Sequence, residues 1–218
     1  MPASTVVSTG TITVIAGPMF AKKTQTMLEM VTLMESRPYA IFKPYSPIAN
    51  PLSLPHCWIY TANGNRYPGL RTKRLTDFTH MKGVSIVGID EGQWVSHRHC
   101  RGGCFFSFRK KKEFSALKKS LLLQYSDLIP FITTLVKDGT DVVISMLTGT
   151  FRQTSFPVFG EVCALADMVI MKTAVCSTCH NRPASFTVRT KQVPRNMTIQ
   201  VRMQKGRGRK KNRRVFRY

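Results

Sequence analysis

Apolar positions in this chain occur in short continuous runs, separated by stretches with helical periodicity. The continuous runs, typical of strands buried on both faces, cover residues 11–16, 39–42, 84–89, 141–146 and 169–175. Helix-like patterns cover about 24–36, 127–136 and 160–167. Because strands alternate with helices, we predict an α/β fold built on a parallel sheet.

Four stretches do not follow this pattern. Residues 44–55 are rich in proline and are predicted to form a loop, while residues 71–80 are mixed polar and receive no assignment. Residues 97–124 lack a strand or helix period over their first half, so we interpret them as an insertion. Residues 202–218 are rich in lysine, arginine and glycine and would not bury a core, which predicts a disordered tail.

The charge of the chain is concentrated in the last two of these stretches. The formal net charge is +22, of which residues 97–124 carry +7 and residues 202–218 carry +9, leaving +6 on the other 173 residues. The basicity is therefore local and is not a property of the fold. The tail could bind nucleic acid, but its only aromatic residues are Phe216 and Tyr218, so a solvated segment is the favoured interpretation.

Composition favours an intracellular globular protein. With 218 residues and 43% hydrophobic content, a sizeable core is expected. There is no apolar run long enough to span a bilayer, and the first residues, Met1-Pro-Ala-Ser-Thr5, lack the features of a signal peptide. We expect a cytoplasmic location without membrane association, and six cysteines that act as thiols or metal ligands rather than disulfides.

The first apolar run leads into a candidate phosphate-binding loop. The run ends at Gly17, and Lys23 and Thr24 precede a helical pattern, as in loops whose backbone N–H groups hold phosphate. Lys23 could reach the outer phosphates of a nucleotide, and Thr24 could offer its hydroxyl to Mg²⁺. Lys22 stands where the pattern has its second glycine, so an ordinary strand–loop–helix remains the alternative. The intervening loop residues are Pro18, Met19, Phe20, Ala21 and Lys22.

Two carboxylates follow the apolar run at 84–89. The carboxyl end of a parallel strand faces the ligand crevice of an α/β sheet, which makes Asp90 a candidate Mg²⁺ ligand and Glu91 a candidate general base. The alternative is that these residues cap the next turn. A second candidate site is Cys176-Ser-Thr-Cys179, which is half of a structural zinc site. Two reduced thiols without metal are the alternative there.

Taken together, these residues resemble the zinc-containing thymidine kinase family of the cellular and poxviral type. The blocks that carry the resemblance are Gly17-Pro-Met-Phe20, Asp90-Glu-Gly-Gln93, Leu147-x-Gly-Thr-Phe151 and Lys172-x-Ala-Val-Cys-x-x-Cys179. The resemblance implies transfer of the ATP γ-phosphate to the 5′-hydroxyl of thymidine, with ATP and Mg²⁺ as cofactors and a homo-oligomer, typically a tetramer.

The resemblance also implies residue roles. Glu91 matches the base and Asp90 the Mg²⁺-linked carboxylate, while Gly17 to Thr24 and Gln93 match the ATP- and phosphate-binding group. Residues that match the thymidine pocket and its zinc-tied lasso loop are Met19, Leu147, Phe151, Phe186 and Thr187. The implied organisation is a kinase domain at 10–172, a partial zinc and lasso domain at 173–201, and the tail at 202–218.

Several features depart from the family pattern. Lys22 replaces the loop glycine, residues 97–124 are added, and no cysteine follows residue 180, so half of the expected zinc ligands are absent. A hypothesis for both basic segments is that they are non-homologous additions, such as retained intervening sequence and a shifted reading frame. The alternative functions are a catalytically impaired member that binds nucleotide or nucleic acid through its basic segments, and an ATPase without nucleoside specificity.

Overall fold

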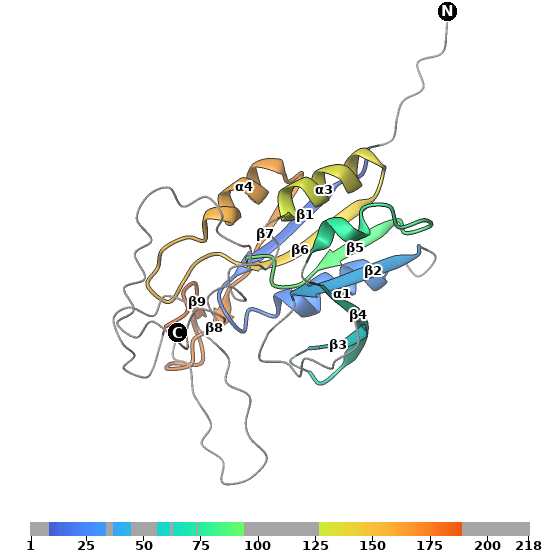
Figure 1. Cartoon of the computed structure of the whole chain (residues 1–218). Coiled ribbons are helices and arrows are strands. Elements are labelled where there is room, and N and C mark those ends of the chain that lie inside the picture. Colours follow the sequence, from blue (N-terminus) through green and yellow to red (C-terminus); the bar gives the residue numbers. More distant parts are fainter. Residues whose placement is uncertain are drawn as a thin grey trace, which may run out of the picture.

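The fold is centred on a mostly parallel β-sheet. The computed structural model describes residues 9–33, 37–44, 56–61, 63–72, 74–93 and 127–188. Its seven-stranded sheet has the order β3-β4-β2-β5-β6-β1-β7, and only the β3–β4 pair is antiparallel (Figure 1). The strands are β1 (Ile12–Gly17), β2 (Tyr39–Pro44), β3 (His56–Tyr60), β4 (Arg66–Thr72), β5 (Ile86–Ile89), β6 (Asp141–Leu147) and β7 (Met168–Met171). The predicted α/β class is confirmed.

Helices cover both faces of the sheet (Figure 1). They are α1 (Lys23–Thr32), the short helix η1 (Leu75–Phe78), α3 (Leu128–Lys137) and α4 (Pro157–Leu165). Met27, Leu28 and Val31 of α1 pack against one face, whereas α3 and α4 bury their apolar sides against the other. The central strands are thus covered on both sides, which explains their continuous apolar runs.

The observed elements differ from the predicted ones at three places. Helix α4 starts at Pro157, before the predicted residue 160, because proline is well suited to the first turn of a helix. The predicted strand at 169–175 is divided into β7 and a separate strand, β8 (Ala174–Val175). The hairpin of β3 and β4 was not predicted at all. Most of the predicted loop at 44–55 lies outside the described residues, as do all of 97–124 and all of 202–218.

A second, two-stranded sheet follows the main one. It pairs β8 with β9 (Pro183–Ala184), and its residues Ala174 and Ala184 form a small buried cluster with Ala21 of the β1–α1 loop. Cys176 packs against this cluster. The small sheet therefore contacts the loop that the sequence marks as phosphate-binding. Among the helices of the described segments, none has the length and apolar character to cross a bilayer.

Asp141, at the start of β6, ties together segments that are distant in sequence. Its Oδ1 accepts hydrogen bonds from the backbone N–H and the hydroxyl of Thr11, at 2.8 and 2.7 Å, and its Oδ2 pairs with Arg37 at 2.6 Å. Burial acts to raise the pKa of Asp141, but the bonds from Thr11 and Arg37 outweigh it, so the pKa lies below the ordinary 3.8. Folding therefore favours the ionised carboxylate.

We expect Asp141→Asn to lower the free energy of unfolding by about 1–2 kcal/mol at pH 7, since charge-assisted hydrogen bonds are lost. A lowered folded-state pKa gives stability that is present above pH 3.8 and is lost as the pH falls through the folded value. The gap between variant and wild type should thus shrink in urea unfolding at pH 3. A gap that is the same at both pH values would contradict this account, and Asp138→Asn, at an exposed carboxylate, serves as the control.

Candidate active site

The carboxyl ends of the parallel strands bring the sequence-predicted residues to one edge of the sheet. Gly17 ends β1 and lies opposite Leu147, the last residue of β6. Asp90 and Glu91 directly follow β5, which is the other neighbour of β6. This edge is where ligands bind in open α/β sheets.

The β1–α1 loop begins at a position that only glycine can occupy. A Cβ built on Gly17 would lie 2.3 Å from the backbone oxygen of Lys172, far inside van der Waals contact. Lys172 in turn donates its N–H to Ala16 O at 2.7 Å, so the two segments are held together by backbone groups. The loop closes with Lys23, whose Nζ donates to Pro18 O at 2.6 Å. The Lys23 ammonium therefore lies over the loop rather than on the outer surface.

Lys22 and Phe20 both have a left-handed backbone in this loop, and Lys22 is the one at the expected glycine position. It precedes the first residue of α1 with φ 54° and ψ 27°, the left-handed region that costs side-chain-bearing residues about 1 kcal/mol or more. The sequence suggested that the Cβ of Lys22 would strain the turn, and the left-handed backbone of this residue is where that strain arises. The chain adopts the turn despite the lysine.

We expect Lys22→Gly to raise the free energy of unfolding by about 0.5–1 kcal/mol, because glycine adopts this conformation without steric cost. Lys22→Ala removes the charge but keeps the Cβ, and it should leave stability nearly unchanged. Urea unfolding of both variants separates the two effects. If the alanine and glycine variants are equally stable, the backbone conformation of residue 22 is not the source of the strain.

Asp90 is the centre of a buried hydrogen-bond network. Its side chain is 1% exposed, and its Oδ1 accepts from the hydroxyls of Thr24 and Ser145, both at 2.7 Å. Its Oδ2 forms an ion pair with Lys43 Nζ at 2.9 Å. The network joins the first turn of α1 to the carboxyl ends of β2, β5 and β6. It satisfies a carboxylate that would otherwise be costly to bury.

Electrostatics keep this carboxylate ionised. Burial acts to raise the pKa of Asp90, but the Lys43 charge and the hydrogen bonds from Lys43, Ser145 and Thr24 prevail, so the pKa lies below 3.8. For Lys23 the effect of burial has the opposite sign: burial lowers the pKa of the ammonium group, and the nearby carboxylates of Glu91 and Asp90 oppose that shift. The edge of the sheet therefore holds two lysines and two acidic residues within electrostatic range.

Glu91 is held in an unusual conformation. Its φ is 60°, in the left-handed region, and its N–H donates to Ser145 Oγ at 3.4 Å. The Gln93 amide donates Nε2–H to Glu91 Oε2 and accepts from Leu147 N at 3.0 Å through Oε1. Backbone strain that is held in place by neighbours is frequent at functional sites. Gln93, predicted among the phosphate-binding residues, contacts the Glu91 carboxylate.

The residues predicted to line the nucleoside pocket come only partly together. Met19 N donates to the hydroxyl of Thr187 at 2.9 Å, which links the β1–α1 loop to a buried residue beyond β9. Leu147 adjoins Gly17, as described above. Phe151 is half-buried in the turn after β6, and Phe186 is 55% exposed.

Cys176 and Cys179 form a compact turn. The pKa of the Cys176 thiol is lowered, chiefly by hydrogen bonds from the backbone N–H groups of Cys179 and Thr178. Such a turn suits thiolate ligation, but a structural zinc ion needs four ligands. Within the residues that the structure describes, no three metal-binding side chains cluster. The described donors therefore do not fit a complete zinc site.

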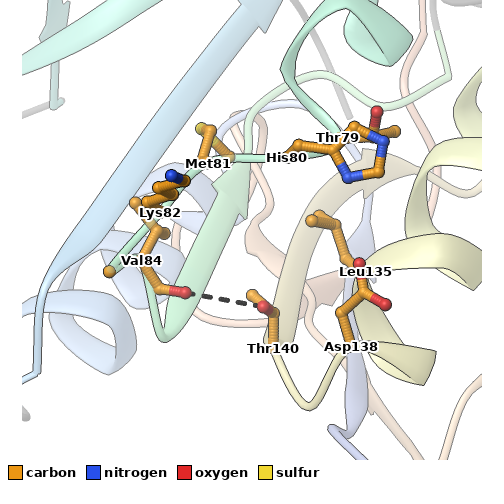
Figure 2. A pocket seen from close by; sticks show the side chains of 9 residues that line it. Thr79, His80, Met81, Lys82, Val84, Leu135, Asp138 and Thr140 are labelled. Atoms are coloured by element: carbon orange, nitrogen blue, oxygen red, sulfur yellow. Dashed lines mark hydrogen bonds between the residues drawn. The ribbon is translucent and has the colours of Figure 1, made fainter.

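A hollow of about 350 Å³ lies elsewhere, at the amino ends of β5 and β6 (Figure 2). There the hydroxyl of Thr140 donates to Val84 O at 3.5 Å across its floor. It contains neither Asp90 nor Glu91, because those residues follow the opposite ends of the strands. The hollow is therefore not the candidate active site. It is lined by Thr79, His80, Met81, Lys82, Gly83, Val84, Leu135, Asp138 and Thr140.

Sequence reasoning missed three residues of the site. Ser145 could have been found, because a polar residue inside the apolar run of β6 is a sign of a functional position. Lys43 directly follows the apolar run of β2, and a charged residue at that place is ordinarily expected to be exposed to solvent. Lys172, whose Nζ donates to Thr26 Oγ1 at 2.7 Å, lies beside α1 only because β7 pairs with β1.

Comparison of the sequence with known proteins finds thymidine kinases. A family model described as thymidine kinase matches residues 121–204. The thymidine kinase of Thermococcus kodakarensis is 28% identical, with 87% of this chain and 85% of the relative covered. The thymidine kinase of Variola virus is 26% identical, with 83% of each chain covered. The cytosolic thymidine kinase of Homo sapiens is also 26% identical, over 87% of this chain and 67% of its own length.

The chain is similar in sequence to thymidine kinases. The range matched by the thymidine kinase family model includes Ser145 and the Cys176–Cys179 turn. The β1–α1 loop, Asp90 and Glu91 precede that range. Their roles are therefore argued from the geometry and from the motifs rather than from the family model.

Proposed function

We propose that this chain is an ATP-dependent thymidine kinase that transfers the γ-phosphate to the 5′-hydroxyl of thymidine. The observation that carries the proposal is the 2.7 Å hydrogen bond between Thr24, on the candidate phosphate-binding loop, and Asp90, beside Glu91. This contact between the candidate phosphate-binding loop and the candidate carboxylates supports a phosphoryl-transfer site. The similarity to archaeal, viral and human thymidine kinases supports the choice of substrate.

Gly17 to Thr24 are proposed to hold the phosphates. Backbone N–H groups of the loop and the amino end of α1 favour negative charge, and Lys23 adds an ammonium when it leaves Pro18 O. The hydroxyl of Thr24 and the carboxylate of Asp90 are oxygen donors of the kind that Mg²⁺ binds. The ion, when bound, would neutralise charge on the transferred phosphoryl group.

Glu91 is proposed to take the proton from the 5′-hydroxyl. As the new oxygen–phosphorus bond forms and the bond to ADP breaks, that proton must leave, and a carboxylate at hydrogen-bond distance can accept it. The hydrogen bond from the Gln93 amide helps to hold the Glu91 carboxylate in position for this step. Ser145 and the strained backbone set the direction in which the side chain starts.

The remaining assignments follow from the resemblance and stay proposals. Thymidine would lie among Met19, Leu147, Phe151, Phe186 and Thr187. Residues 10–172 would form the kinase domain, with 173–201 as a partial zinc and lasso domain. The chain would act as a homo-oligomer, a tetramer in the family.

The test is formation of thymidine monophosphate from ATP by the purified chain, followed with and without Mg²⁺. Product that requires both thymidine and Mg²⁺ is expected. ADP formation at the same rate without thymidine would replace the proposal with an ATPase. Absence of any turnover in a folded sample that still binds ATP would favour a catalytically impaired member.

A further inference from the structure

The hairpin of β3 and β4 lies at one edge of the sheet (Figure 1). It carries exposed aromatic rings. Trp58 is 49% exposed and Tyr60 is 63% exposed, whereas Ile59 between them is fully buried. Because side chains alternate along a strand, both rings lie on the outward face while Ile59 anchors the hairpin to the core. Two large rings left on one outward face are unusual unless something contacts them.

The opposite strand adds a positive charge to this face. Trp58 lies opposite Pro68 and Tyr60 opposite Arg66, and the Arg66 guanidinium carbon is 4.8 Å from the centroid of the Trp58 ring. Arg66 and Pro68 are themselves exposed. Residues 56–72 contain two arginines and no acidic residue. The face therefore combines aromatic surface with the positive charge of Arg66.

We propose that this aromatic face, formed by Trp58, Tyr60, Arg66 and Pro68, binds single-stranded nucleic acid. Unpaired bases stack on exposed aromatic rings, and a neighbouring arginine provides the cation for the backbone phosphate. A duplex hides its base faces and would not use the rings. The net charge of +22 gives the chain as a whole a long-range attraction for a polyanion.

The aromatic face is separate from the candidate active site. In the sheet order, β4 and β2 stand between β3 and β5, which leads to Asp90 and Glu91. Substitutions of Tyr60 should therefore leave phosphate transfer unchanged. The inference does not depend on the proposed function, and each can fail without the other.

The test uses tryptophan fluorescence of the full chain. The sequence has two tryptophans, Trp58 and Trp94, so Trp94→Phe leaves Trp58 as the sole reporter. This variant is titrated at fixed ionic strength with oligothymidine and oligouridine of roughly 12 nucleotides, and with an abasic oligomer of the same length. Stacking predicts that base-bearing oligomers quench Trp58 and that the abasic oligomer does not.

Matched variants of Tyr60 complete the test. Tyr60→Ala should weaken oligothymidine binding about tenfold, and Tyr60→Phe, which keeps the ring, should bind like the parent. Equal binding of abasic and base-bearing oligomers, or full affinity in Tyr60→Ala, would overturn the proposal in favour of charge alone. A Trp58 signal that responds to protein concentration and not to oligomer would also overturn it, in favour of a second copy.

Discussion

Replacing Glu91 with glutamine is expected to lower kcat for thymidine phosphorylation by a factor of about 10²–10⁴. The amide has nearly the same size as the carboxylate, and its oxygen can still accept the hydrogen bond from Gln93. It cannot accept the proton of the substrate hydroxyl. Affinity for ATP should change little, because the phosphates are assigned to the loop at 17–24. Steady-state kinetics and isothermal titration with ATP measure the two quantities.

The control is Glu161→Gln, which changes an exposed carboxylate of α4 and should leave both quantities at wild-type values. If Glu91→Gln lost ATP affinity as strongly as turnover, Glu91 would be part of the nucleotide site rather than the base. Unchanged turnover would remove it from the mechanism altogether.

Replacing Asp90 with alanine is expected to lower the free energy of unfolding by about 3 kcal/mol. The substitution removes the acceptor shared by the hydroxyls of Thr24 and Ser145 and the anion that faces Lys43. Asp90→Asn should cost less, since its amide oxygen can still accept both hydroxyl hydrogen bonds. Urea unfolding at neutral pH measures the free energy of unfolding of the wild type, Asp90→Ala and Asp90→Asn.

Lys43→Met, combined with Asp90→Ala, measures the coupling between Lys43 and Asp90. If the ion pair matters, the costs of Asp90→Ala and Lys43→Met will not add, and the double variant will be more stable than their sum predicts. Strict additivity, together with equal costs for alanine and asparagine at position 90, would show that the carboxylate is not held by these partners.

The sequence predicted those strands that are buried on both faces, because such burial requires a continuous apolar run that is visible in the sequence. Strand β5, at Ile86–Ile89, is buried on both faces, so its residues are all apolar or glycine, and the polar residues after it were expected at the crevice edge. The hairpin was missed because Pro68 and Gly69 argue against a strand, and because exposed Trp58 and Tyr60 hide the alternation. The Asn63-Gly64 turn was the signal that could have found it.

The contacts of the candidate site were less predictable. Lys43 and Asp90 are 47 residues apart, and Met19 and Thr187 are 168 residues apart. Periodicity and propensity report on neighbours within a few turns, so such pairs emerge only when the strand order is known. The resemblance anticipated that Thr187 would approach the nucleoside pocket, but not that its hydroxyl would bond the backbone of the β1–α1 loop.

The position of β1 has a consequence for how the chain is made. Both of its neighbours in the sheet, β6 and β7, are encoded more than a hundred residues later. At translation rates of 5–20 residues per second, the first strand to emerge waits roughly 10 s for its partners. The apolar residues of β1 therefore stay exposed until β6 and β7 have been synthesised. During that time this strand is the segment for which binding to a chaperone would matter most.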